Sequence, residues 1–280
     1  AQYALGRIHA KFDLPPSTLT EQNIHEHLLR VAPKGEVTAR GGNVDKAGKL
    51  ADRMIETRYF DGYVAHAPIE THAALAHIER GKCTVWASTQ NPFGARDKVA
   101  RAIDFSPDRV RVITPFVGGG FGGKTSNMQA VEAARLARTV GRPVQVMRTR
   151  EEEFFYDTFR PAAVVNIRSG IDGSGRITFW DYEVLFAGQR GAEHFYEIPN
   201  HRTVVRPQGW SGGPHPFATG AWRAPANNTN TFARESQMSA MAAAAGADAI
   251  EFRLKHLGDP RMIRVLKAAA QRFGWTPAAT

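Results

Sequence analysis

The sequence is organised around one glycine-rich segment, residues 117–125, which reads VGGGFGGKT. It follows an apolar run over residues 110–116 that is typical of a strand, and it precedes a helical pattern over residues 127–140. Glycine adopts positive φ without steric cost, so a run of glycines can present successive backbone N–H groups to an anion or to a metal-bound oxygen. A turn usually needs only one glycine, so five within six residues predict a loop that holds a ligand.

The same segment fits the phosphate-binding P-loop pattern, because its glycines are followed by Lys124 and Thr125 at the required spacing. In that interpretation Lys124 would contact nucleotide phosphates and Thr125 would bind magnesium. A P-loop protein also needs an acidic residue at the end of an apolar strand, and the candidate here, Asp181, lies inside a predicted hairpin. Phe121 would in addition fill the space that its glycine neighbours leave open. Nucleotide binding therefore remains the weaker alternative.

Composition narrows the classes of protein to consider. The 280 residues, 42% of them hydrophobic and 22% charged, are ordinary for a globular chain with a sizeable core. The net charge of +9 is compatible with an anionic cofactor or partner, but the basic residues are dispersed, which argues against nucleic-acid binding. No apolar run approaches the roughly 20 residues of a membrane span. The single cysteine, Cys83, excludes an internal disulfide and an iron–sulfur cluster held by this chain alone.

Strand and helix patterns alternate and are joined by one hairpin, which predicts an α/β (α+β) fold with mixed sheets and flanking helices. Helices are expected over residues 21–31, 44–58, 93–103, 127–140, 235–245, 249–257 and 260–273. Strands are expected over residues 57–60, 82–87, 110–116 and 144–147, with a hairpin of 164–168 and 176–184 around the turn 172–175. Residues 188–217 are expected to form a long irregular connection. Residues 1–60 are interpreted as the tail of a preceding domain and residues 61–280 as the main domain.

Several motifs in a fixed order surround the glycine loop. They are residues 63–74 (YVAHAPIETHAA), 88–90 (STQ), 221–227 (AWRAPAN), 232–236 (FARES) and 251–257 (EFRLKHL). Together with the loop they resemble the molybdenum-binding subunit of the xanthine oxidase family of molybdenum hydroxylases. The resemblance extends from about Tyr63 to Trp275, and it corresponds to the first of the family's two molybdopterin-binding domains.

The resemblance implies a molybdenum centre held by a pyranopterin, alone or as its cytosine dinucleotide, with no direct ligand from the protein. Gln90, Phe121 and Arg223 are expected to lie near the metal, where Gln90 would donate to an oxo ligand and Phe121 would exclude solvent. Backbone N–H groups of the loop glycines are expected to face anionic atoms of the cofactor. These glycines are Gly119, Gly120, Gly122 and Gly123.

The motif at residues 63–74 contains polar residues of a different kind. Glu70 and His72 are expected to be buried scaffold residues below the site, and a metal pair formed by His66 and His72 is a less favoured alternative. The helices that contain Glu235 and Arg253 are expected to be structural.

Two departures from the family bear on the substrate. Purine-oxidising members carry a glutamate directly after the loop lysine, where this sequence has Thr125. They also carry an aromatic residue two positions after the site arginine, where this sequence has Pro225. Both differences favour an aldehyde or another nitrogen heterocycle over a xanthine-like substrate.

A third departure concerns catalysis. The family's base is a glutamate in a Gly-Glu-Gly motif of the second molybdenum-binding domain, and this sequence has no corresponding motif. We therefore expect no catalytic base in this chain, half of a cofactor site, and a partner chain that carries the second domain. Iron–sulfur clusters, with FAD or haem, are expected on further subunits. The reaction would be hydroxylation of a small molecule with oxygen from water. A non-catalytic assembly subunit of the same fold remains an alternative, and nothing in the sequence decides between the cytoplasm and the periplasm.

Overall fold

The computed structural model describes residues 4, 6–13, 16, 18–206 and 214–277. Its helices are α2 (Ile24–Val31), α3 (Val44–Gly48), α4 (Pro92–Ala102), α5 (Met128–Val140), α6 (Arg150–Tyr156), α7 (Asn227–Ala244), α8 (Ala249–His256) and α9 (Pro260–Phe273), with short 3₁₀ turns η1 (Pro107–Arg109) and η2 (Gly123–Thr125). Its strands are β1 (Glu36–Gly41), β2 (Arg53–Asp61), β3 (Val64–Ala65), β4 (Ala73–Glu79), β5 (Lys82–Ala87), β6 (Val110–Ile113), β7 (Val144–Met147), β8 (Phe159–Arg160), β9 (Ala163–Ile171), β10 (Ile177–Leu185) and β11 (His201–Arg206).

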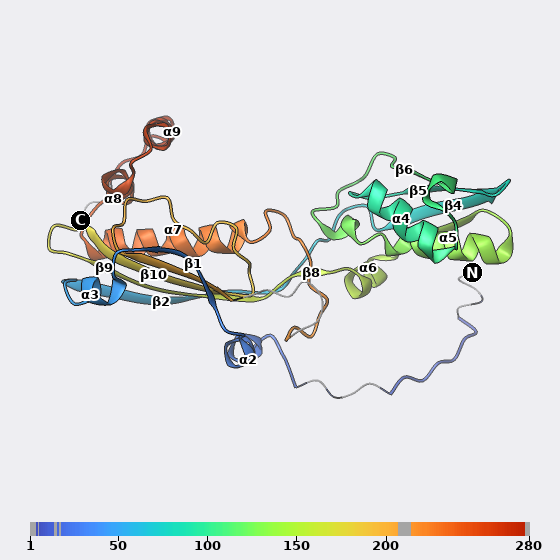
Figure 1. Ribbon diagram of the computed structural model, residues 1–280, viewed down its shortest axis with the longest axis horizontal. Helices are drawn as coiled ribbons and strands as arrows, with labels where there is room; N and C mark the ends of the chain where they lie inside the picture. The colour runs from blue at the N-terminus through green and yellow to red at the C-terminus, as the bar shows by residue number, and fades with distance from the viewer. Residues whose placement is uncertain (1–3, 5, 14–15, 17, 207–213, 278–280) are drawn as a thin grey trace.

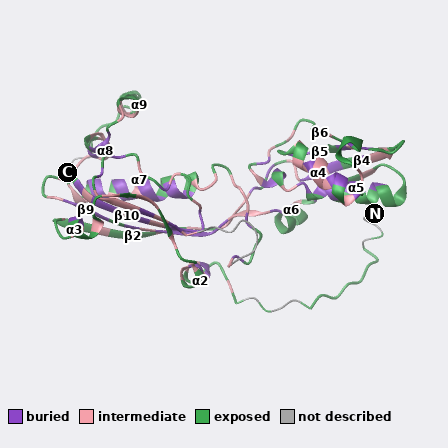
Figure 2. Ribbon diagram, in the orientation of Figure 1, coloured by how far each residue is buried: buried purple, intermediate pink, exposed green. Residues whose placement is uncertain are grey.

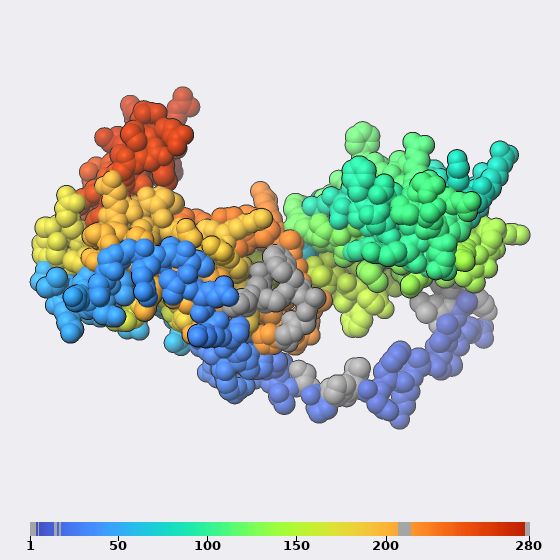
Figure 3. All heavy atoms as spheres, viewed as in Figure 1, coloured from blue at the N-terminus to red at the C-terminus, as the bar shows by residue number. Residues whose placement is uncertain are grey.

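The elements form two lobes that lie end to end (Figures 1 and 3). The large lobe contains a five-stranded sheet with the strand order β1-β11-β10-β9-β2, together with α2, α3, α7, α8 and α9. The small lobe contains a four-stranded sheet with the order β6-β5-β4-β7, together with α4, α5 and α6. The predicted class, a mixed α/β fold with flanking helices, is confirmed.

The core of the large lobe lies between its sheet and α7, where Figure 2 shows the buried residues concentrated. Ile167 of β9 and Tyr182 and Val184 of β10 are buried together with Met238 and Met241 of α7. Removing one such side chain from water stabilises the fold by about 1.5–3 kcal/mol. The predicted hairpin is confirmed, because β9 and β10 pair antiparallel on either side of the turn.

The small lobe has its own core, between one face of its sheet and the helices α4 and α5. Alanines on both sides of this interface, among them Ala74 of β4 and Ala133 of α5, let helix and sheet approach closely. β4 and β5 form an antiparallel hairpin, and α4 connects β5 to the parallel strand β6. Helix α5 ends at Val140 and is capped by Gly141, whose φ of +64° is the left-handed conformation that favours glycine at a helix end.

Two predictions for the first half of the large lobe are corrected. The helix expected over residues 44–58 is limited to α3, since β2 begins at Arg53 and pairs with β9 over its whole length. In β2 the partly buried residues alternate with exposed ones: Ile55, Thr57 and Tyr59 are partly buried, and Ile55 and Tyr59 pack against the core. Such a period of two favours a strand. The expected domain boundary at residues 60/61 falls inside β2, and the division into domains stays a prediction.

The irregular connection expected over residues 188–217 contains the strand β11, which pairs with β10 in parallel and with β1 antiparallel. Its β-branched residues Thr203, Val204 and Val205 suit a strand. Residues 207–213 of this expected connection lie outside the part of the chain that the structure describes. Helix α7 starts at Asn227, earlier than the predicted residue 235, and α6 was not predicted. None of the helices in the described ranges is long and apolar enough to cross a membrane.

Candidate functional site

The glycine loop connects β6 to η2 in the small lobe and has a strained backbone. Gly119 and Gly122 have φ values of +96° and +116°, which favour glycine. Phe121 lies between them with a φ of +53°, a left-handed conformation that costs a phenylalanine energy and that clusters at functional sites. The side chain of Phe121 is 44% exposed. The loop therefore displays this ring on the surface instead of burying it in the core.

Gln90 lies between the end of β5 and the start of α4, directly beneath the loop. Its side-chain Oε1 accepts a hydrogen bond from the Gly122 N–H at 2.9 Å. A Cβ at Gly120 would lie 2.5 Å from the same oxygen, so this approach requires glycine there. With its oxygen held by the loop, Gln90 has a side-chain NH₂ that donates to none of the residues that the structure describes. This group is available to donate to a ligand.

Arg223 reaches the loop from the large lobe, in the segment that precedes α7. Its backbone N–H donates to the Phe121 carbonyl at 2.8 Å. Its side chain is exposed and makes no ion pair or hydrogen bond within the described ranges of the chain. The structure thus brings together Gln90, Phe121, Gly122 and Arg223, which come from three separate segments.

The N–H groups of the loop differ in their availability. The N–H of Gly122 is bonded to Gln90, and the N–H of Gly123 donates to the Gly120 carbonyl at 2.9 Å. The expectation that both of these amides face a ligand is therefore wrong, because the loop uses them to hold its own shape. The N–H groups of Gly119, Gly120 and Phe121 have no acceptor among the described residues. These three remain available to an anionic ligand.

Lys124 excludes the P-loop interpretation. Its side chain is 0% exposed, and its Nζ lies 2.5 Å from Oε2 of Glu70, which also accepts the Gly118 N–H at 3.0 Å. A lysine that is buried and neutralised in this way cannot reach a phosphate above the loop. Asp181, the candidate for a magnesium-binding acid, is instead bonded to Arg202 in the sheet of the large lobe. Glu70 holds the base of the loop, but its side chain is 34% exposed, so the prediction that it is buried is wrong, whereas His72 is buried as predicted.

His66 and His72 do not form a metal pair, because each is bonded to a different carboxylate. His66 Nδ1 lies 2.8 Å from Asp157, and His72 Nδ1 lies 2.7 Å from Glu153. Both carboxylates belong to the region of α6, and sequence reasoning missed them because nothing in their local pattern marks them. Within the described part of the chain, no cluster of three or more His, Cys, Asp or Glu residues could hold a metal.

One member of each pair, His66 and Glu153, has a pKa that is shifted towards its charged form. Burial lowers the pKa of His66, but the hydrogen bond and charge of Asp157 and the carbonyl of Ala221 outweigh burial and raise it above its usual value. Burial raises the pKa of Glu153, yet its hydrogen bonds from His72 prevail and lower it. The His66–Asp157 pair lies against the glycine loop, since a Cβ at Gly123 would lie 2.6 Å from Asp157 Oδ2.

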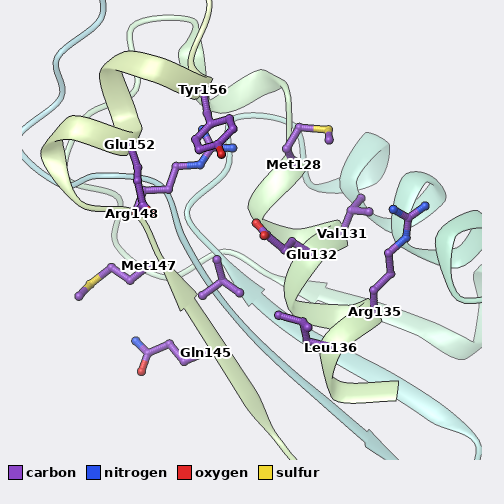
Figure 4. Close-up of a pocket in the computed structure, with 11 residues that line it drawn as sticks. Met128, Val131, Glu132, Arg135, Leu136, Gln145, Met147, Arg148, Glu152 and Tyr156 are labelled. Atoms are coloured by element: carbon purple, nitrogen blue, oxygen red, sulfur yellow. The ribbon is translucent and has the colours of Figure 1, made fainter. Parts of the chain in front are cut away.

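The small lobe also contains a large groove. That groove, of about 700 Å³, lies between α5, β7 and α6, and Met128, Leu136, Met147 and Tyr156 are among its lining residues (Figure 4). Gln90, Phe121 and Arg223 do not line it.

Comparison with known proteins matches this arrangement to a family. A family model described as the molybdopterin cofactor-binding domain matches residues 24–257. A nicotinate dehydrogenase subunit from Pseudomonas putida is 30% identical over 261 residues, which cover 84% of this chain and 22% of that protein. The aldehyde oxidoreductase molybdenum-binding subunit PaoC of Escherichia coli K12 is 31% identical over 262 residues, which cover 84% of this chain and 34% of that protein.

Solved structures show the same fold. Quinoline 2-oxidoreductase from Pseudomonas putida 86 aligns with a TM-score of 0.74 and 18% identity over 87% of this chain and 35% of that one. The chain therefore spans between about a fifth and a third of the length of these relatives. The family match, the convergence of Gln90, Phe121 and Arg223, and the fold lead to one conclusion. The chain belongs to the molybdopterin cofactor-binding domain family of the molybdenum hydroxylases, the family of xanthine oxidase.

Proposed function

We propose that this chain forms one side of the molybdenum cofactor site of a hydroxylase that oxidises an aldehyde or a nitrogen heterocycle with oxygen from water. The observation that carries the proposal is that backbone and amide hydrogen bonds bring Gln90 and Arg223, whose side-chain donors have no partner among the described residues, against the glycine loop at Gly122 and Phe121. The names of the relatives, a nicotinate dehydrogenase and an aldehyde oxidoreductase, support these two substrate classes.

The residues of the site fit a metal that is held by its cofactor. The surface offers hydrogen-bond donors and a fixed positive charge, and it lacks a cluster of protein ligands within the described residues. When bound, the cofactor supplies the redox-active molybdenum at which the substrate is hydroxylated. Gln90 and the N–H groups of Gly119, Gly120 and Phe121 would orient its anionic atoms, and Arg223 would balance negative charge there. The exposed ring of Phe121 would keep water away from that position.

A catalytic base is expected from outside this chain. The carboxylates nearest to the loop are engaged: Glu70 with Lys124, Asp157 with His66 and Glu153 with His72. We propose that the base lies on a second molybdenum-binding domain, and that residues 61–280 correspond to the first. Cys83 is buried and its pKa is raised to about 11 by that burial, so it suits packing and not cluster binding. Iron–sulfur clusters, with FAD or haem, are accordingly assigned to partner subunits.

The surface beside the loop suits such a partner. Ile69 is 96% exposed and Phe116 is fully exposed. Both lie close in sequence to the backbone hydrogen bond that the Glu70 N–H donates to the Gly118 carbonyl. Phe93, which follows Gln90 in the chain, is 73% exposed. Large apolar side chains gathered beside a site mark a surface that another protein covers.

The proposal is tested with Gln90→Ala and Arg223→Ala in the assembled protein, assayed with a panel of aldehydes and nitrogen heterocycles and a dye as electron acceptor. Loss of one prearranged donor should lower kcat by roughly 10²- to 10³-fold. Matched controls are Gln145→Ala on β7 and Arg101→Ala on α4, two exposed residues outside the site, which should leave kcat unchanged. If both site variants retain full activity, the chain is a non-catalytic assembly subunit.

A further inference from the structure

His66 lies where three segments of the chain meet beneath the proposed site. Its side chain is 0% exposed, and it follows β3, in the joint between the lobes. Nδ1 lies 2.8 Å from Oδ2 of Asp157, the C-terminal cap residue of α6, and Nε2 lies 2.8 Å from the carbonyl oxygen of Ala221. The glycine loop closes over the ring, since a Cβ at Gly123 would lie 2.9 Å from Nδ1.

Both ring nitrogens of His66 therefore face acceptors. A carboxylate and a backbone carbonyl can only accept hydrogen bonds, so both contacts are satisfied only when both nitrogens carry protons. His256 shows the opposite arrangement in the same chain. Its Nε2 accepts from the Ile177 N–H at 3.0 Å while its Nδ1 faces the Phe252 carbonyl at 2.8 Å, which fits a neutral ring.

The Ala221 carbonyl that His66 binds is also pressed against the loop. A Cβ at Gly122 would lie 1.8 Å from this oxygen, so the two backbones touch. The next residue, Trp222, donates its indole N–H to the Ala65 carbonyl at 3.2 Å. Residues 65–66 thus hold residues 221–222 from below, directly before Arg223, whose N–H then reaches the Phe121 carbonyl.

We propose that His66 is a positioning residue, held as an imidazolium between Asp157 and the Ala221 carbonyl, that fixes the backbone of residues 221–223 against Gly122 and thereby sets the place of Arg223 beside Phe121. The effect of His66 on the cofactor rests on the proposed function. The protonation of its ring rests on the hydrogen-bond geometry alone. Asp157 is the charged group that faces the ring from α6. The other neighbours of the His66 ring are uncharged backbone groups of Ala221, Thr158 and the glycine loop.

The balance of burial and hydrogen bonding agrees with this state, since the pKa of His66 is raised despite the burial that opposes it. A group whose pKa is raised in the fold stabilises the fold below its unfolded pKa of about 6.5, and that contribution is lost as the pH rises through the folded value. The joint between the lobes should therefore loosen as the pH rises above this range, and not as it falls.

The first arm of the test needs no cofactor. The protein is purified in its natural assembly with ¹⁵N-labelled histidine, and the ring nitrogens of His66 are assigned as the signals that His66→Gln removes. At pH 7 we expect both His66 nitrogens to carry protons, whereas His256 shows one protonated and one bare nitrogen. Asp157→Asn should return His66 to the singly protonated state at the same pH. A singly protonated His66 in the unaltered protein would overturn the proposal.

The second arm uses two replacements that each keep one of the two hydrogen bonds. The amide of His66→Gln reaches the place of Nε2 and can still donate to Ala221, whereas the amide of His66→Asn reaches only the place of Nδ1. We expect His66→Asn to lower kcat roughly 10- to 100-fold with little change in KM, because Arg223 is misplaced, and His66→Gln to restore most of that loss. Molybdenum content per chain should follow the same order.

His256→Gln is the matched control for the loss of a buried histidine. It should lower the thermal midpoint while leaving kcat and molybdenum content unchanged. Equal losses of molybdenum and kcat in His66→Asn and His256→Gln would overturn the positioning role, as would an unchanged His66→Asn. A protein that never contains molybdenum contradicts the proposed function, and the histidine protonation still decides the first arm.

Discussion

At the scale of single residues, four of the five loop glycines are required by four different neighbours. Gly120 admits the amide of Gln90, and Gly122 admits the carbonyl of Ala221. Gly118 and Gly123 admit the side chains of Glu70 and Asp157. The glycines thus bring the loop into contact with polar groups from both lobes, and they leave the N–H groups of Gly119, Gly120 and Phe121 without an acceptor among the described residues.

Gly122→Ala should destabilise the protein more than the strain of a positive φ alone, because the new side chain would also clash with a neighbouring backbone. Its φ of +116° strains any L-residue, at about 1–3 kcal/mol, and the new Cβ would meet the Ala221 oxygen at 1.8 Å. The matched control is Gly246→Ala, where φ is +63° and nothing lies within 4 Å. Urea denaturation should give a loss of unfolding free energy that is larger for Gly122→Ala. Equal losses would contradict the close contact between loop and segment 221–223.

Lys124→Met should lower the unfolding free energy by about 2–4 kcal/mol, because it leaves the Glu70 carboxylate without its cation in a partly buried position. The control is Arg261→Met, whose side chain is 82% exposed in its pair with Asp259 and should contribute no more than about 1 kcal/mol. Denaturant titration of both variants measures the difference. A Lys124→Met protein as stable as the unaltered one would argue against this pair as a support of the loop.

The sequence predicted the ligand-holding character of the loop, since a glycine run with one aromatic residue has few other uses. The companions Gln90 and Arg223 were identified through motifs around the loop, and the structure brings them together with it. Asp157 was not predicted, because its partner His66 is separated from it by 91 residues and no local pattern records such a pairing. The internal use of the Gly122 and Gly123 amides was equally hidden, as it depends on how the loop curls on itself.

At the scale of elements, α6 supports the site although it contributes no residue to it. The helix begins with a capping box, in which the Thr149 hydroxyl accepts from the Glu152 N–H and the Glu152 carboxylate accepts from the Thr149 N–H. It then presents Glu153 to His72 and ends at Asp157, which holds His66. This short helix thereby connects the edge of the small lobe to the joint beneath the loop.

Thr149→Ala should cost about 1 kcal/mol of stability, the usual effect of losing an N-cap side chain. Because α6 is short, the loss should also increase hydrogen exchange at the amides of residues 152–157. Thr139→Ala in the last turn of α5 is the control, since this exposed hydroxyl caps no helix start, and its effect should remain within about 0.5 kcal/mol. Unchanged exchange in α6 would show that the capping box is not what holds the helix.

Elements with a strong local pattern were predicted well, and those defined by distant partners were not. α5 with its Gly141 cap and the β9–β10 hairpin carry their own signals in periodicity and turn residues. β11 is a strand because it fits between β1 and β10, and its short sequence resembles the irregular segments around it. β2 begins only a few residues after the short helix α3, so the helical and strand patterns cannot be separated in the sequence.

At the scale of the whole molecule, each lobe has its own hydrophobic core, and the buried polar residues His66 and Asp157 lie where the lobes join. The proposed site lies at this joint, with Gln90 and the loop from the small lobe and Arg223 from the large one. Its geometry therefore depends on how firmly the lobes are held together, which is the role assigned to His66 and its neighbours.

Acidification should destabilise the large lobe through two other histidines. Burial, together with the charge of His201 near His194 and of His27 near His215, lowers the pKa values of His194 and His215 to about 4. Both are neutral in the fold and protonated in the unfolded chain below about 6.5, so their contribution is lost as the pH falls from 6.5 towards 4. Each should account for a loss of order 1 kcal/mol, measured as urea midpoints at pH 7 and pH 5. The double variant His194→Phe/His215→Phe should flatten this dependence, and an unchanged slope would contradict the assignment.

The central claim is that this chain forms part of a molybdenum cofactor site, and the metal content of the purified assembly tests it most directly. Plasma mass spectrometry of the complex that contains the unaltered chain should find one molybdenum atom for each copy of the chain, and the Gln90→Ala/Arg223→Ala double variant should contain less. The same preparation should not bind ATP, because Lys124 is buried against Glu70. An assembly without molybdenum whose isolated chain binds ATP in the presence of magnesium would contradict the account.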